Sequence, residues 1–228
     1  LHRWQAKFRG VLFQKIEYAP FNFSDVIPMF NDKVETGFFQ HSRCEPIRRY
    51  STKERSPHFL FFKQSAYNWL SVSLDSPPCF GSSGKAIPQT EVDRIRLRDE
   101  QTKKILLLLF TGRMFFTYWM VYGDEFHLTS GDLLNFRLPI EEFTAKDIAV
   151  LLKLADDVAG SFRGTVQFKL NAGKNVGSYN TTKLWHITDK SDMIFLRYMT
   201  DQPEQVFESM MRHVSQTILT DKNEQSPA

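Results

Sequence analysis

The 228-residue sequence is poor in the residues that mark fibrous and disulfide-stabilised proteins, with 2 Cys, 11 Gly and 10 Pro. These counts exclude a collagen-like repeat and a disulfide scaffold. Cys44 and Cys79 stand without a CxxC pair or a Cys/His cluster, so we expect no structural zinc site. Two lone thiols fit a reducing cytoplasm, which is the location we expect, although one disulfide between them stays open.

Signature motifs of several enzyme classes are missing as well. The sequence has no GxGxxG or GxxxxGK[ST] phosphate loop, no GxSxG nucleophile motif and no HExxH zinc motif. Its six His residues show no metal-ligand spacing. We therefore assign no catalytic, cofactor-binding or metal-binding residue. The chain starts at Leu1 without Met or a signal peptide, and we expect it to be a piece of a longer protein.

The residues that are present indicate a globular domain with a large core. Hydrophobic residues make up 42% of the chain, charged residues 24% and aromatic residues 14%, with 21 Phe. Such a composition excludes a disordered chain or a coiled coil. Lys and Arg number 29 against 26 Asp and Glu, a net charge of +3, which permits an acidic partner such as nucleic acid without requiring one.

Periodicity predicts an α+β fold, a small mixed β-sheet packed with several helices. Alternating or apolar runs indicate strands at 59–62, 67–74 and 91–98. Helical patterns cover 100–122, 144–160, 189–198 and 203–219, within the usual error at helix ends. Residues 1–58 are predicted to be an irregular, basic N-terminal segment, 59–219 the domain, and 220–228 a frayed tail.

Local signals set the helix ends. Thr144 and Asp147 resemble a capping box, and Gly160 is expected to end that helix. Asp189 is a candidate N-cap, and Pro203 can occupy the first turn of the last helix.

The longest apolar stretch, 100–122, is predicted to be one buried helix packed against the 148–158 helix or the sheet. A transmembrane span is the alternative, but Arg113 near its centre would be costly in lipid. In a buried helix Arg113 needs a partner or an exit to solvent, and Asp124 and Glu125 are the candidate partners.

Ser76-Pro77-Pro78-Cys79 follows a predicted strand and resembles the catalytic motif of amino-group DNA methyltransferases. That motif ends in an aromatic residue that stacks on the flipped base, whereas here Phe80 comes one position late. The Gly-rich turn for S-adenosylmethionine is also missing. We favour a Pro-Pro loop leaving a strand, with a degenerate catalytic loop as the alternative.

Several segments resemble type II restriction-modification adenine methyltransferases. Tyr67-Asn68-Trp69, the Pro-Pro loop and Lys85 resemble the family's "YW…PP…K" stretch, and 106–119 resembles its "LLNSxLFYWYW" helix. The most specific match is 122–139, YGDEFHLTSGDLLNFRLP, against "GDxFHLTxxDLLNFPIP". Residues 177–192 are similar to its "VGNYN…ITDxID" tail.

In that family these segments form the C-terminal target recognition region. The resemblance implies that this chain recognises a double-stranded DNA sequence, and that an upstream domain binds S-adenosylmethionine and methylates a flipped adenine. Whether the same protein also carries a fused nuclease domain is left open. The rival interpretations are a complete but degenerate methyltransferase and a protein-interaction scaffold rich in exposed aromatics. No membrane partner is expected.

Basic residues interleaved with aromatics supply candidate DNA contacts, since cations neutralise phosphates and flat or forked side chains reach bases. The candidate phosphate contacts are Arg48, Arg49, Lys53, Arg55, Arg94 and Arg96. The candidate groove contacts are Tyr67, Lys85, Asn171, Lys174 and Asn180. The GDxFHLT segment is expected to form a capped turn, with Asp124, His127 and Thr129 fixing the chain. Base reading then falls to loops 76–90 and 161–180.

Overall fold

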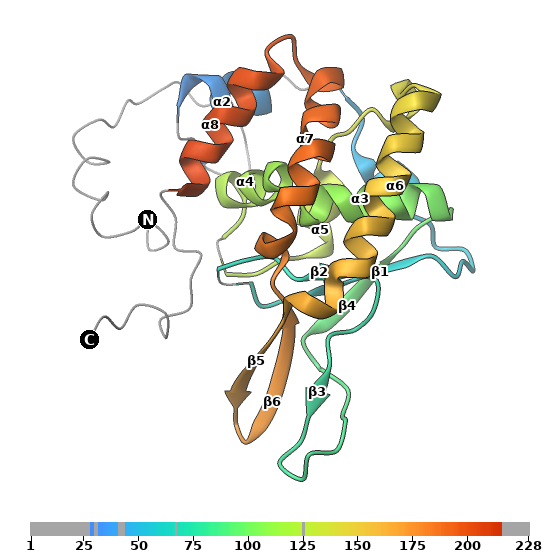
Figure 1. Ribbon diagram of the computed structural model, residues 1–228, viewed down its shortest axis with the longest axis vertical. Helices are drawn as coiled ribbons and strands as arrows, with labels where there is room; N and C mark the ends of the chain where they lie inside the picture. Colours follow the sequence, from blue (N-terminus) through green and yellow to red (C-terminus); the bar gives the residue numbers. More distant parts are fainter. Residues whose placement is uncertain (1–27, 30–31, 41–43, 67, 125, 216–228) are drawn as a thin grey trace, which may run out of the picture.

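The computed structural model describes residues 28–29, 32–40, 44–66, 68–124 and 126–215. Over these ranges the fold is α+β, as expected, with helices gathered in one body from which a small sheet projects (Figure 1). The α-helices are α2 (Lys33–Gln40), α3 (Glu100–Thr111), α4 (Arg113–Tyr122), α5 (Ser130–Asn135), α6 (Ala145–Ser161), α7 (Trp185–Met199) and α8 (Pro203–Ser215). The 3-10 helices are η1 (Ile47–Tyr50), η2 (Ile140–Glu142), η3 (Phe162–Thr165) and η4 (Thr181–Leu184). The strands are β1 (Phe59–Lys63), β2 (Val72–Ser73), β3 (Cys79–Phe80), β4 (Val92–Arg96), β5 (Val166–Asn171) and β6 (Lys174–Tyr179).

One three-stranded antiparallel sheet, ordered β2-β1-β4, closes one side of the helical body. Leu60 and Phe62 of β1 are buried, while Phe59 and Phe61 face the other way, the alternation expected of a strand with one covered face. The strand expected over 67–74 is wrong in extent, because only Val72 and Ser73 pair with β1. This sheet and the projecting sheet, ordered β3-β6-β5, are both purely antiparallel, whereas a mixed sheet was expected.

The apolar stretch 100–122 is buried as predicted, but it forms two helices rather than one. Helices α3 and α4 are bent by 65° across a break at Gly112. Every residue from Ile105 to Thr111 is buried, and α3 contacts α6 and strands β1 and β2. Among the described residues no single helix is both long and apolar enough to cross a membrane, and only the bent α3–α4 pair reaches that length.

The break at Gly112 is filled by a carboxyl group from α7. Asp192 is fully buried, and its Oδ2 accepts a hydrogen bond from the backbone N–H of Met114 at the start of α4 (3.1 Å). A Cβ atom at Gly112 would lie 2.4 Å from Asp192 Oδ1. Only glycine therefore leaves room for this carboxyl at a helix start that has no side-chain cap of its own.

The partner of Arg113 is Asp189 and not the expected Asp124, while Glu125 lies outside the described residues. Arg113 Nε donates to Asp189 Oδ1 (2.7 Å), and the guanidinium lies over the ring of Trp185, 4.2 Å from its centre. Asp189 therefore is not an N-cap. Helix α7 begins at Trp185, earlier than predicted, because tertiary contacts with α4 hold its first turn.

The other helix boundaries follow the sequence more closely. Thr144 caps α6 by accepting from Asp147 N–H (3.2 Å), as predicted, and Pro203 opens α8. Gly160 does not end α6, since the helix continues through Ser161 and runs into η3.

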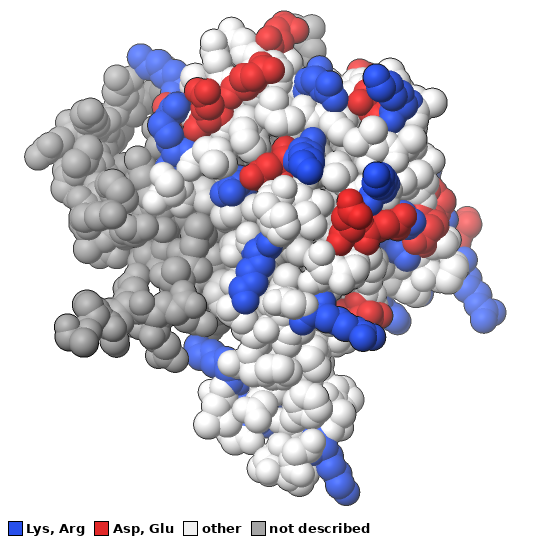
Figure 2. Space-filling model, viewed as in Figure 1, with Lys and Arg blue, Asp and Glu red and all other residues white. Residues whose placement is uncertain are grey.

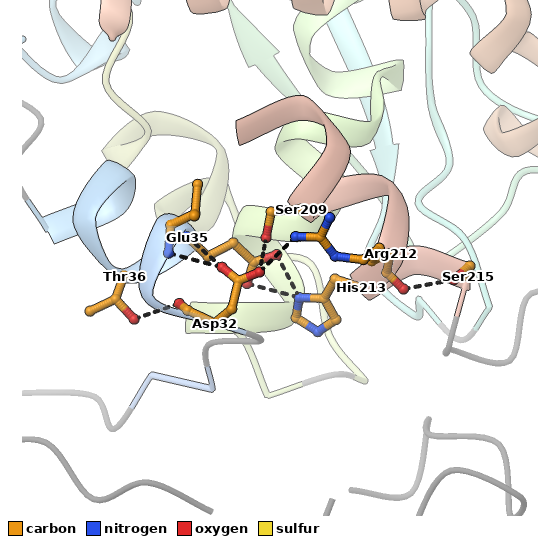
Figure 3. A network of polar contacts seen from close by, with 8 residues as sticks. Asp32, Glu35, Thr36, Ser209, Arg212, His213 and Ser215 are labelled. Atoms are coloured by element: carbon orange, nitrogen blue, oxygen red, sulfur yellow. Dashed lines mark hydrogen bonds and ion pairs between the residues drawn. The ribbon is translucent and has the colours of Figure 1, made fainter. Parts of the chain in front are cut away.

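Helix α2 is fastened to α8 by the polar network of Figure 3. Asp32 accepts from the N–H groups of Val34 and Glu35, both at 3.0 Å, and from Ser209 Oγ (2.6 Å). The buried His213 places Nδ1 3.0 Å from both carboxylate oxygens of the buried Glu35. The described part of 1–58 is thus no separate irregular segment: α2 and η1 pack into the common core through Phe38, Ile47 and Tyr50.

Replacing Gly112 by Ala should destabilise the fold by about 1–3 kcal/mol, because the new methyl group collides with Asp192. Gly160→Ala is the matched control: it lies inside α6 with nothing within 4 Å of the added carbon, so it should stabilise by about 0.5–1 kcal/mol. Urea unfolding of both variants measures the difference. Equal stability of the two would contradict the assigned role of Gly112.

Asp192 should also make stability depend on pH. Burial raises its pKa to about 8, and the nearby Asp189 adds to this, against the opposing hydrogen bond from Met114 N–H. The folded state then binds this proton more tightly than the unfolded chain, whose Asp pKa is about 3.9. Stability is lost as the pH rises from about 4 to about 8, by at most about 1.4 kcal/mol per pH unit.

Asp192→Asn cannot titrate at this position. As the pH rises through this window, the unfolding free energy of wild type should therefore fall relative to that of the variant. Urea unfolding at several pH values gives the comparison. A constant difference across the window is the result that would refute the shifted pKa.

Candidate nucleic-acid interface

The two loops assigned to base reading, 76–90 and 161–180, come together in the sheet that projects from the helical body (Figure 1). This antiparallel sheet is ordered β3-β6-β5. We call the sheet together with loop 81–90 the lobe. Its two components are far apart in the sequence, and backbone pairing of Cys79 with Val176 and of Phe80 with Asn175 joins them.

The outer end of the lobe is a tight hairpin. Asn171 pairs with Lys174 across a two-residue turn, Ala172-Gly173, and both turn residues have positive φ, 47° and 74°. Two positive φ values define the type I′ turn, whose twist matches that of paired strands. The hairpin β5–β6 therefore has a fixed register up to its tip.

Close backbone contact fastens loop 81–90 to the hairpin. Gly177 N–H donates to Pro78 O (2.9 Å), and a Cβ atom at Gly177 would lie 2.4 Å from that oxygen. The amide Nε2 of Gln89 donates to Pro77 O, Pro78 O and Gly177 O. One side chain thus ties three carbonyl groups of two chain segments together.

The base of the lobe is anchored in the core. Ser71 Oγ accepts from Tyr179 N–H (3.0 Å), and the buried Thr181 donates through Oγ1 to Leu70 O (2.6 Å). Asn180 N–H donates to Thr165 O, which closes the hairpin where it leaves the body. Hydrogen bonds at its base therefore attach the lobe to the body.

The lobe carries positive charge only. The sequence contains no Asp or Glu in 76–90 or in 158–188, whereas Lys85, Lys169 and Lys174 are exposed there. On the face seen in Figure 2 the projecting part shows blue and white atoms without red, while red and blue mix over the helical body. Near the base, burial lowers the pKa of Lys63, Lys169 adds to this, and Glu91 opposes it.

Three of the predicted groove contacts, Lys85, Asn171 and Lys174, are exposed together on this projection. A fourth predicted groove contact, Asn180, is buried, and its Oδ1 accepts from Thr182 N–H to cap η4. Its assignment as a groove contact is wrong because that side chain already has an internal partner. Tyr67 lies outside the described residues.

The predicted phosphate contacts occupy a different, electrically mixed surface. Arg49 is paired with Glu141, which also accepts from the Tyr50 hydroxyl, and Arg48 Nη2 donates to Asn135 Oδ1 (3.0 Å). Arg94 and Arg96 lie over the Phe59 ring, 4.5 Å and 5.2 Å from its centre.

Arg96 also donates to Glu54 O (2.9 Å), within the exposed segment that carries Lys53 and Arg55. Exposed acids lie beside these cations, including Glu54 and Asp93. A surface of both signs attracts phosphate less than the lobe does.

The GDxFHLT segment forms the capped turn predicted for it. Asp124 Oδ1 accepts from the N–H groups of Phe126 (2.8 Å) and His127 (2.6 Å). Thr129 and Asp132 form a reciprocal capping box that starts α5. These polar groups therefore hold the backbone of the turn.

The Pro-Pro segment and the cavities lie in different parts of the structure. Ser76-Pro77-Pro78-Cys79 is the entry to β3, with Cys79 and Pro77 buried, as expected for a Pro-Pro loop leaving a strand. Two cavities in the described part, of about 170 and 410 Å³, are lined by other residues, on the helical body. No disulfide joins Cys44 and Cys79. Within the described ranges no group of three His, Cys, Asp or Glu could hold a metal ion.

Sequence reasoning missed the outer strand of the lobe. Phe168, Lys169 and Leu170 of β5 are all exposed, and none was a candidate. Two signals could have identified them: the acid-free run 158–188, and Gly173 between two alternating segments.

Comparison with protein-family models, curated proteins and solved structures finds no match to this chain.

Gly177→Ala should detach β3 from β6, because the added carbon collides with Pro78 O. In the variant, amide hydrogen exchange at position 177 and at Asn175 should be at least about tenfold faster than in wild type, since these strand contacts open locally. Gly164→Ala is the control, with nothing within 4 Å of its added carbon. Unchanged exchange in Gly177→Ala would show that the lobe does not depend on this contact.

Proposed function

We propose that this chain recognises double-stranded DNA by placing the lobe in a groove. The observation that carries the proposal is a projecting, hydrogen-bonded β-sheet with exposed lysines and no acidic residue. Cations on a projection attract the phosphates on both sides of a groove, and each contact releases bound counterions. The major groove, about 12 Å wide, admits a two-stranded β-ribbon such as β5–β6.

The proposed context is an adenine-specific DNA methyltransferase of a restriction-modification or phage-defence system. The motif similarities over 67–192 support it, and the lobe supplies what a target recognition module needs. An upstream domain of the same protein would bind S-adenosylmethionine and methylate the flipped adenine. The chain described here would hold and orient the duplex, without a catalytic residue of its own.

A protein-interaction scaffold is the second candidate, because Leu170 is 71% exposed and Phe168 51%. Exposed apolar side chains of this size also mark protein interfaces. The two candidates differ in their dependence on salt. Binding through apolar contacts changes little with ionic strength, whereas binding through phosphates weakens steeply.

Duplex binding by the full chain should fall with salt, with a log–log slope of about −4 to −5 for roughly four to six phosphate contacts. Changing Lys85, Lys169 and Lys174 together to Ala should reduce the slope by up to about 2.7, since each neutralised phosphate contributes about 0.9. Fluorescence anisotropy with a labelled duplex measures both.

The matched control changes three exposed lysines of the helical body to Ala: Lys146, Lys153 and Lys190. It removes the same charge and should keep most of the slope. Equal losses in both triple variants would mean that net charge, and not the lobe, drives binding. A flat slope in the parent chain would reject DNA recognition.

A further inference from the structure

The two faces of the lobe differ in chemistry. Residues that pair directly across antiparallel strands point to the same face. Phe168 pairs with Gly177, while Leu170 and Phe80 both pair with Asn175, so these three apolar side chains share one face. Lys169 pairs with Val176 on the opposite face. The exposed strand β5 thus presents apolar groups on one side and a cation on the other.

The apolar face is held in position although it is open to solvent. The ring of Phe168 packs on that of Phe80, with 5.8 Å between their centres. Gly177 leaves the space beside it, since a Cβ atom there would lie 3.3 Å from Phe168 Cε1. Leu170 stands two residues nearer the tip and is more exposed than any other large apolar side chain in the described part.

The spacing of these side chains matches the repeat of a duplex. Residues two apart on a strand are about 6.6–6.8 Å apart along it. Successive base pairs rise by about 3.4 Å, so two steps cover about 6.8 Å. Phe168 and Leu170 are therefore spaced to meet two different base pairs, about one to two steps apart, when β5 lies in the groove.

Charge favours DNA over a protein as the occupant of this face. The lobe has a net positive charge, because it carries Lys85, Lys169 and Lys174 and no acid lies in 76–90 or 158–188. Lys169 and Lys174 pair with Val176 and Asn171 on the face opposite the apolar side chains. In the major groove the apolar group on a base edge is the C5-methyl of thymine, and Phe is among the residues that contact it. A single wedge between base pairs is a different arrangement, usually made from the minor groove.

Building on the proposed DNA recognition, we propose that Phe168 and Leu170 read thymine methyl groups at two positions in the major groove. Lys85, Lys169 and Lys174 supply the attraction to phosphate that does not depend on sequence. Specificity and affinity then reside in different side chains of the same lobe. Removing the apolar side chains should alter sequence preference while the salt dependence stays the same.

The test starts with selection of duplexes from a randomised pool by the full chain. The selected duplexes are then copied with either thymidine or deoxyuridine, which lacks the C5-methyl group. Wild type should bind the deoxyuridine copies about fourfold more weakly for each methyl contact, or about fifteenfold for two, from about 0.8 kcal/mol per buried carbon.

Leu170→Ala should bind the two copies with a ratio closer to one, and the double variant with Phe168→Ala should not distinguish them. Both should keep the wild-type salt slope. Val150→Ala is the control, because it truncates an apolar side chain that is 42% exposed on α6, and it should keep the full discrimination. Leu170 is so exposed that its truncation leaves the fold intact, which keeps the single variant informative.

Equal binding of thymidine and deoxyuridine copies by wild type, with a steep salt slope, would overturn the methyl contacts and leave DNA recognition standing. Selection of no preferred sequence would do the same. An increase in 2-aminopurine fluorescence that Leu170→Ala abolishes would indicate a wedge and also overturn it. If wild type self-associates and Leu170→Ala is monomeric, the face is a protein interface. Absence of salt-dependent binding to any duplex would overturn the proposed function itself.

Discussion

The buried carboxyl of Asp192 joins helix α7 to the junction between α3 and α4. It takes the place of a cap at the start of α4, and Gly112 leaves the space that it fills. The apolar run 100–122 can therefore bend by 65° and bury both halves in one body. A straight helix of that length would leave much of its apolar circumference without cover. Burial of the carboxyl in turn raises its pKa and links the fold to pH.

Helix α7 connects this junction to the lobe. It carries Asp189 and Asp192, and it follows β6 after the single turn η4. The same helix that closes the core thus holds the hairpin, while Ser71 and Thr181 attach the hairpin to the body. A projection anchored at several points keeps its shape when it meets a partner, so little ordering entropy is lost on binding.

Division of charge between body and projection explains the proposed function. The body mixes acids and bases, and several of its arginines are held by internal partners such as Glu141 and the Phe59 ring. The lobe has lysines without acids and, on one face, apolar side chains open to solvent. Phosphate attraction and base reading require these two kinds of surface side by side.

Local patterns were enough to predict the α+β class, the burial of 100–122 and the capped turns at Thr129 and Thr144, because each depends on near neighbours in the chain. The position of the break in the apolar run depends on tertiary contacts, since Gly112 is matched to a carboxyl 80 positions away. The tertiary structure also decided that loops 76–90 and 161–180 form one lobe and that Asn180 faces inward. Pairing between distant strands depends on contacts that no local pattern records, and those contacts bring the exposed side chains of β5 to the surface of the projection.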